Sequence, residues 1–120
     1  MSKHAFHITG GKQELYDIMT SVQSAPEPVF LLDYFAEWCG PCKAISPTLV
    51  ALTATHAMHQ RSLYLFKIDV DEPGNDDLVS MFKVKSMPTL VWLVDGQTYA
   101  RVEGADKNRI IETTNAARST

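Results

Sequence analysis

Residues 29–42 read VFLLDYFAEWCGPC, and this stretch decides what fold the rest of the chain can build. Its first half, Val29–Phe35, is almost uniformly apolar and predicts a central strand that is buried on both faces of a sheet. Its end places the only two cysteines of the chain, Cys39 and Cys42, at the start of a predicted helix. A C-x-x-C pair at a strand-to-helix junction, in a chain without other cysteines, indicates redox chemistry.

The two thiols are expected to lie on one side of the first helical turn, because residues at i and i+3 share a helix face. They can therefore close a small disulfide and reopen it with little backbone movement. Cys39 is predicted to be the attacking thiol, since the free N–H groups and the dipole of a helix N-terminus stabilise a thiolate. Cys42, one turn further in, is predicted to be more buried and to resolve the mixed disulfide. Gly40 would let a substrate approach closely, and Pro41 suits the first helical turn.

Apolar periodicity and turn residues predict the remaining elements on either side of this stretch. Helices are predicted over about 12–24, 40–58, 76–82 and 106–117, and strands over 4–8, 29–35, 63–69, 89–94 and 97–103. The early part of this order requires parallel strands with right-handed crossovers, and the turn at Asp95 and Gly96 requires an antiparallel hairpin. We therefore expect an α/β fold, a single domain over residues 1–120, with a mixed sheet of about five strands and about four helices on its two faces.

The composition limits the possible partners and locations. Of the 120 residues 45% are hydrophobic and 21% are charged, which is ordinary for a soluble globular protein. The net charge of -3 and the absence of a basic stripe argue against nucleic acid or an anionic membrane as a partner. Residues 1–7 lack the apolar run of a signal peptide and the arginines of a transit peptide, so we expect a cytoplasmic protein. In the cytosol a C-x-x-C pair is more often catalytic than structural.

A zinc site is the main structural alternative for the cysteines, because His56 and His59 follow them. The gap between the two histidines is too short for a C2H2 finger, and the segment before them reads as an amphipathic helix containing Pro47. No metal is therefore expected, and the histidines are interpreted as a solvated helix end.

Asp33 interrupts the apolar strand six residues before Cys39. Either it lies on an exposed face, or it is buried with a raised pKa and accepts the Cys42 proton directly or through water. Lys67 on the next predicted strand is its candidate counter-charge, although an ordinary surface lysine is equally compatible with the sequence. Pro88 precedes a strand, and sequence alone gives its peptide bond only about a 5–6% chance of being cis.

Taken together, these residues resemble the thioredoxin family over nearly the whole chain. The matching positions are residues 33–43, Pro47, Lys67, the turn 71–74, residues 87–89, Gly96 and residues 104–105. The resemblance implies the thioredoxin fold and a cis Met87–Pro88 bond that faces the disulfide. It also implies a surface that docks reductase and substrates, formed by Trp38, Gly40, Pro41, Met87, Pro88, Gly104 and Ala105. Glu103 is less usual for the family, and its carboxylate on the rim of that surface would disfavour acidic partners.

The activity implied by this resemblance is the reduction of protein disulfides, which maintains the redox balance of the cell. No bound cofactor is expected besides the redox-active Cys39–Cys42 disulfide, with electrons coming from NADPH through a flavoprotein reductase. The expected partners are thioredoxin reductase and disulfide-containing proteins such as peroxiredoxins or ribonucleotide reductase, and the chain is expected to be a monomer. Two alternatives stay open: a disulfide oxidase or isomerase, and a thioredoxin-like binding subunit whose cysteines are incidental.

Overall fold

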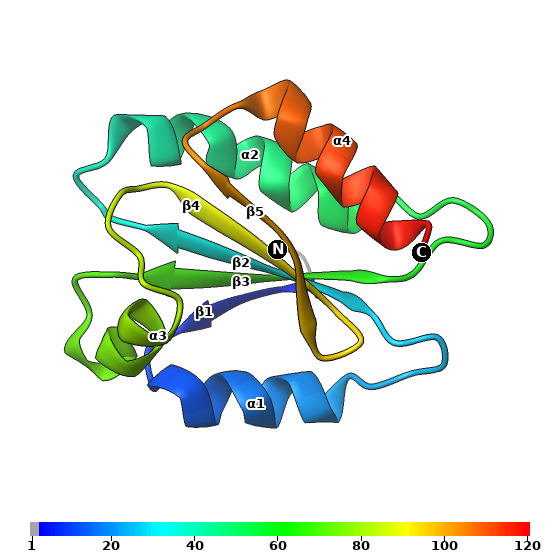
Figure 1. The fold of residues 1–120 in the computed structure, drawn as a ribbon, viewed down its shortest axis with the longest axis horizontal. Helices are drawn as coiled ribbons and strands as arrows, with labels where there is room; N and C mark the ends of the chain where they lie inside the picture. Colours follow the sequence, from blue (N-terminus) through cyan, green and yellow to red (C-terminus); the bar gives the residue numbers. More distant parts are fainter. Residues whose placement is uncertain (1–2) are drawn as a thin grey trace.

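A five-stranded sheet lies between two pairs of helices in residues 3–120, the part of the chain that the computed structural model describes (Figure 1). The strands are β1 (Ala5–Ile8), β2 (Val29–Phe35), β3 (Leu63–Asp69), β4 (Thr89–Val94) and β5 (Gln97–Glu103). The helices are α1 (Gly11–Ser21), α2 (Gly40–Ala54), α3 (Asp76–Met81) and α4 (Lys107–Arg118), with a short 3-10 turn, η1 (Pro73–Asn75), before α3. Met1 and Ser2, which begin the segment assessed for a targeting signal, lie outside the described residues.

The sheet has the mixed topology that the element order predicts. Its strands lie in the order β1-β3-β2-β4-β5, with β1, β3 and β2 parallel and β4 and β5 antiparallel to their neighbours. Helices α2 and α4 cover one face and α1 and α3 the other (Figure 1). Strand β2 is therefore the centre of the sheet, as its apolar sequence indicates. No helix in the described part of the chain is long and apolar enough to cross a membrane.

Two helices are shorter than their predicted ranges. The predicted helix 12–24 ends at Ser21, where Val22 closes it with its N–H on the Ile18 carbonyl, before a connector whose prolines disfavour helix. The predicted helix 40–58 ends at Ala54, and Thr55 is extended. Thr53 is the last buried residue of α2, and residues 54–59, Met58 among them, are all exposed. Burial, rather than periodicity, sets the end of α2.

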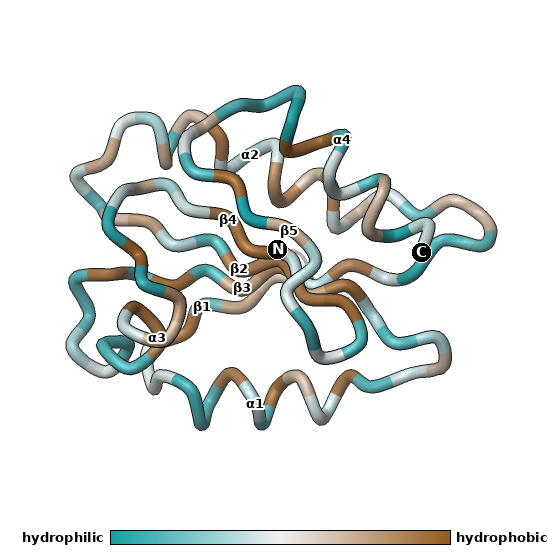
Figure 2. Tube along the Cα trace, in the orientation of Figure 1, coloured by the Kyte–Doolittle hydropathy of each residue, from teal (hydrophilic) through white to brown (hydrophobic). Residues whose placement is uncertain are grey.

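Alternation along β2 builds two separate cores. Val29 and Leu31 pack towards α2 and α4, whereas Phe30 and Leu32 pack towards α1 and α3. Figure 2 shows the apolar residues gathered along the central strands between the helical layers. The same period of two places Asp33 on the side of α2, so that the carboxylate meets the helix that carries the cysteines.

Candidate functional site

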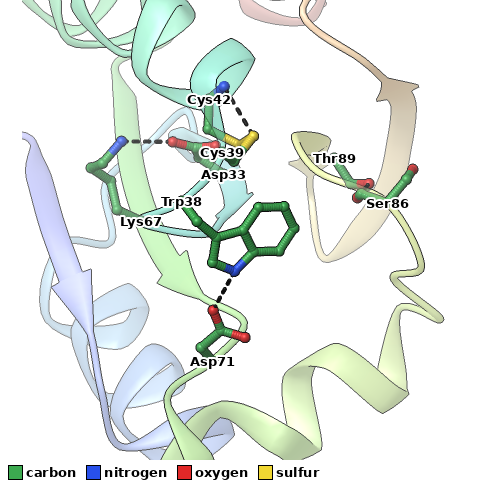
Figure 3. Close-up of a disulfide and its surroundings, with 8 residues drawn as sticks. All are labelled: Asp33, Trp38, Cys39, Cys42, Lys67, Asp71, Ser86 and Thr89. Carbon is green, nitrogen blue, oxygen red and sulfur yellow. Dashed lines mark hydrogen bonds and ion pairs between the residues drawn. A yellow bond between two sulfur atoms is a disulfide. The ribbon is translucent and has the colours of Figure 1, made fainter.

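The two cysteines form a disulfide at the start of α2 (Figure 3). Their Cα atoms are 5.3 Å apart. Cys39 is the N-cap of the helix, and its Sγ accepts the backbone N–H of Cys42 at 3.2 Å. Gly40 and Pro41, the first two residues of α2, are both exposed. Apart from its chain neighbours and the backbone of its own helix, no atom lies within 4 Å of the place that a Cβ of Gly40 would occupy. A partner can therefore approach the disulfide from the side of Gly40.

The prediction that Cys42 is more buried than Cys39 corresponds to only a small difference in exposure in the disulfide form. Cys39 is 4% exposed and Cys42 is 3% exposed. Both sulfurs belong to one small apolar cluster with Ala36, against which Met87 packs. Position along the helix therefore hardly separates the two residues by burial in this form.

Asp33 is buried and paired with Lys67 (Figure 3). The carboxylate is 1% exposed, and its Oδ2 lies 2.7 Å from the Lys67 Nζ. Its Oδ1 has no hydrogen-bond partner among the described residues. Burial raises the pKa of Asp33, and the opposing effect of the nearby Lys67 charge is smaller. Of the two sequence interpretations, the buried carboxylate with a lysine partner is the one that the structure contains, and it leaves one carboxylate oxygen able to take a proton.

A cavity of about 160 Å³, partly open to solvent, lies beside Cys42 and Lys67. Cys42 and Ser46 line it from α2, Lys67 from β3 and His7 from β1. His7, Lys67 and Asp33 are consecutive partners across β1, β3 and β2, so a polar row crosses the sheet beneath the N-terminal part of α2. This arrangement can move a proton between Cys42 and the outside of the molecule.

The residues predicted to dock partners lie in the segments 38–41, 87–88 and 104–105, and Met87 packs against the disulfide cluster. Trp38 is 69% exposed, and its Nε1 donates to Asp71 Oδ2 at 2.8 Å (Figure 3). The Met87–Pro88 bond is cis, which confirms the expectation from the resemblance and not the low sequence prior. The Gly104 N–H donates to the Pro88 carbonyl at 2.8 Å, so Gly104 lies beside Pro88, and Ala105 next to it is exposed.

Glu103 is less free to repel acidic partners than its sequence position suggests. It is exposed, but its Oε2 lies 3.5 Å from the Arg101 Nε, and its Oε1 accepts from Ser86 Oγ at 3.4 Å. The arginine offsets part of the carboxylate charge. The effect of Glu103 on partner choice stays a prediction.

The histidines of the zinc alternative lie beyond the end of α2. His56 and His59 are exposed, and the His56 Nε2 is bonded to the Gln60 carbonyl at 2.8 Å. Cys39 and Cys42 are bonded to each other. The sequence spacing that resembles a zinc finger therefore does not correspond to a shared site in this fold.

The sequence reasoning missed two polar residues of the site. Ser46 contacts the Lys67 ammonium, and its spacing of four residues from Cys42 could have placed it on the same helix face. Asp71 anchors the Trp38 indole, but this contact joins two loops and leaves no local sequence signal.

The raised pKa of Asp33 predicts a pH dependence of stability. Below the ordinary pKa of 3.8, both the folded and the unfolded chain carry the proton. Above it the unfolded chain releases the proton while the folded chain retains it, so the stabilising contribution is lost as the pH rises through the folded-state pKa. The free energy of unfolding of the wild type minus that of Asp33→Asn should therefore fall with pH, by at most about 1.4 kcal/mol per pH unit.

Urea unfolding of the disulfide form over a series of pH values measures this difference. Asp95→Asn is the control of opposite sign, because its hydrogen bond to Arg61 lowers the pKa of Asp95. For that residue, wild type minus variant should rise as the carboxylate ionises. A difference for Asp33→Asn that also rises with pH would mean that the Lys67 charge outweighs burial.

The comparisons with known proteins all match thioredoxins. The family model described as Thioredoxin matches residues 13–116. Thioredoxin-1 of Caenorhabditis elegans is 36% identical over 94 residues, which cover 78% of this chain and 76% of the relative.

Two solved structures match nearly the full length. One comes from work on how the yeast mitochondrial 1-Cys peroxiredoxin is resolved through the glutathione and thioredoxin systems. It has a TM-score of 0.75 and 25% identity, and covers 93% of this chain and 94% of its own. The other, from a complex of ferredoxin:thioredoxin reductase with thioredoxin f2, has a TM-score of 0.79 and 23% identity over 97% of this chain and 96% of its own, which shows the fold alone.

Proposed function

Because the chain belongs to the thioredoxin family and is a protein-disulfide reductant, we propose that Cys39 is its attacking thiol and Cys42 its resolving thiol. The observation that supports this assignment most is the place of Cys39 at the N-cap of α2, with its sulfur against the Cys42 N–H. A thiolate there is stabilised by the free N–H groups and the dipole of the helix. Cys42 instead lines the cavity that Lys67 also borders.

The reaction proceeds in two exchanges in which electrons and protons balance. The Cys39 thiolate attacks one sulfur of the substrate disulfide, so that a bond from Cys39 to the substrate forms and one substrate thiol leaves with a proton from solvent. Cys42 then gives its proton to Asp33, directly or through water, and its thiolate attacks the Cys39 sulfur. The Cys39–Cys42 bond forms, and the second substrate thiol leaves. It leaves as a thiolate and takes a proton from solvent, Asp33 releases the Cys42 proton, and two electrons have passed to the substrate.

Asp33 is suited to this step by geometry, because it is buried and one of its oxygens has no protein partner among residues 3–120. Lys67 holds the other oxygen and limits the cost of burying the charge. Pro88 and Met87 shape the opposite side, where an extended segment of the substrate would lie against the Met87 backbone.

The electrons are proposed to come from NADPH through a flavoprotein reductase, thioredoxin reductase. The proposed substrates are proteins with accessible disulfides, such as peroxiredoxins or ribonucleotide reductase, and the chain is proposed to act as a cytoplasmic monomer without nucleic-acid or membrane partners. A solved relative bound to a ferredoxin-dependent reductase makes a second electron source worth testing. Support for the oxidase, isomerase and binding-subunit alternatives is weaker, since the relatives compared are thioredoxins.

Coupled turnover tests the proposed source of electrons. The protein, a disulfide-bonded protein substrate and an NADPH-dependent thioredoxin reductase should together oxidise NADPH, and omission of any one should stop the reaction. Turnover only with a ferredoxin-dependent reductase would replace the proposed source of electrons without changing the roles of the cysteines.

Ala105→Asp should weaken docking without harming the redox chemistry. A carboxylate at this exposed position would be buried unpaired against a protein partner, so kcat/KM for the reductase should fall by at least about tenfold. The rate with a small aromatic disulfide should stay the same, because that molecule does not cover the surface. Ala51→Asp on the exposed side of α2 is the matched control, and an equal loss there would remove Ala105 from the docking surface.

A further inference from the structure

The Lys67 ammonium is held from three directions. Its Nζ lies 2.7 Å from Asp33 Oδ2, 3.1 Å from Ser46 Oγ and 4.9 Å from the centre of the Phe35 ring. A lysine head is a point charge on a flexible stem with three donors, so its position depends on such contacts. The serine hydroxyl is the one of the three that comes from α2, the helix of the cysteines.

Ser46 follows Cys42 by four residues, which places both on one face of α2, a turn apart. Both line the cavity that Lys67 also borders. Ser46 therefore links the helix that carries the resolving cysteine to the strand that carries the lysine. The cysteine motif itself does not call for a hydroxyl at this position.

We propose that Ser46 is a positioning residue for the proton transfer from Cys42, because its hydroxyl keeps the Lys67 ammonium on Oδ2 of Asp33 and leaves Oδ1 as the proton acceptor. The proposal deepens the proposed function and rests on the role given there to Asp33. During resolution the Cys42 proton moves to Oδ1, the thiolate attacks Cys39, and the lysine keeps its charge throughout.

Loss of the hydroxyl would let the ammonium move into the cavity. The charged and titratable groups that face the pair there are His7 from β1, Glu37 from the loop before α2, and Cys42 and Lys43 from α2. On β4 the residue opposite Asp33 is the apolar Leu90. Glu37 and water can therefore compete with Asp33 for the Lys67 ammonium. The contact with Ser46 keeps the ammonium on Asp33.

Ser46→Ala is expected to raise the pKa of Asp33. Lys67 lowers the pKa of Asp33 against the larger effect of burial, so a weaker contact raises that pKa further. In Ser46→Ala the carboxylate then forms only at higher pH, and the pH midpoint of the resolving step should rise by about half a unit, which is a threefold change in the ionisation constant. Ser46→Thr keeps a hydroxyl and should restore the midpoint.

The resolving step is measured in a stopped-flow instrument at a series of pH values, as the release of the second thiol from a symmetric aromatic disulfide. The carbon-13 shift of the Asp33 carboxyl in the reduced protein reports the same ionisation directly. Alanine is a better helix former than serine, so Ser46→Ala should fold. Ser80→Ala, at an exposed position of α3, is the matched control.

The same substitution in a Lys67→Met background separates positioning from a general effect of the serine. The proposal predicts a shifted midpoint in Ser46→Ala, an unshifted one in Ser46→Thr, and no further shift when Lys67 is already absent. An unchanged midpoint in Ser46→Ala overturns it, as does a shift that persists without Lys67. If Asp33→Asn leaves the midpoint in place, the role of Asp33 and this inference both fail, whereas failure of Ser46→Ala alone leaves Asp33 in its role.

Discussion

Cys42→Ser will remain covalently joined to its substrate after a single exchange. Cys39 can still attack, but without a second thiol the mixed disulfide cannot be resolved. Incubation of the reduced variant with a disulfide-bonded protein should give a complex that survives denaturing electrophoresis, is cleaved by dithiothreitol, and has the summed mass of the two partners.

Cys39→Ser is the matched counterpart and should form no such complex while losing all turnover, because a serine hydroxyl is not ionised at the helix N-terminus. The assignment would be reversed if Cys39→Ser formed the stable complex and Cys42→Ser did not. Equal trapping by both variants would mean that position at the N-cap does not decide which sulfur attacks.

Asp33→Asn should slow the resolving step by about 10²-fold, at the lower end of what a positioned proton acceptor contributes. The amide has nearly the same shape but cannot take the Cys42 proton. The first exchange should change little, because Cys39 lies at the N-cap and is stabilised by the helix. Release of the two thiols from an aromatic disulfide separates these steps within one stopped-flow trace.

Asp95→Asn is the control for that measurement, since it removes a carboxylate that is paired with Arg61 in an exposed position. It should change neither step. If Asp33→Asn slows the first exchange as much as the second, the carboxylate acts through the general field of the site rather than as the acceptor for Cys42.

The fold was largely predictable from the sequence, because the pattern of apolar residues indicates which segments are buried. The run Val29–Phe35 is apolar except for Asp33, and β2 is the centre of the sheet with a core on each face. The ends of α1 and α2 were less predictable. The end of each helix depends on how far its side chains can pack against the sheet, and this packing is a property of the tertiary structure.

The site was predictable in part. Lys67 could be named as a candidate partner of Asp33 because it lies on the neighbouring predicted strand, and the structure shows that the two are register partners. The cis bond before Pro88 came only from the resemblance, since no local pattern fixes it. Ser46 and Asp71 were missed because a serine in a helix and an aspartate in a turn have ordinary local explanations. Their contacts, from Ser46 to Lys67 and from Asp71 to Trp38, join segments that are distant in the sequence.

The most direct test of the reductant assignment is the equilibrium of Cys39 and Cys42 with a graded thiol–disulfide buffer. Fluorescence of Trp38, exposed beside Cys39, should follow the reaction, and Trp38→Phe identifies the signal. We predict a reversible two-electron titration with a midpoint below the cytosolic glutathione poise, more negative than about -220 mV. A midpoint near about -180 mV or above, where disulfide isomerases and oxidases lie, would contradict the reductant.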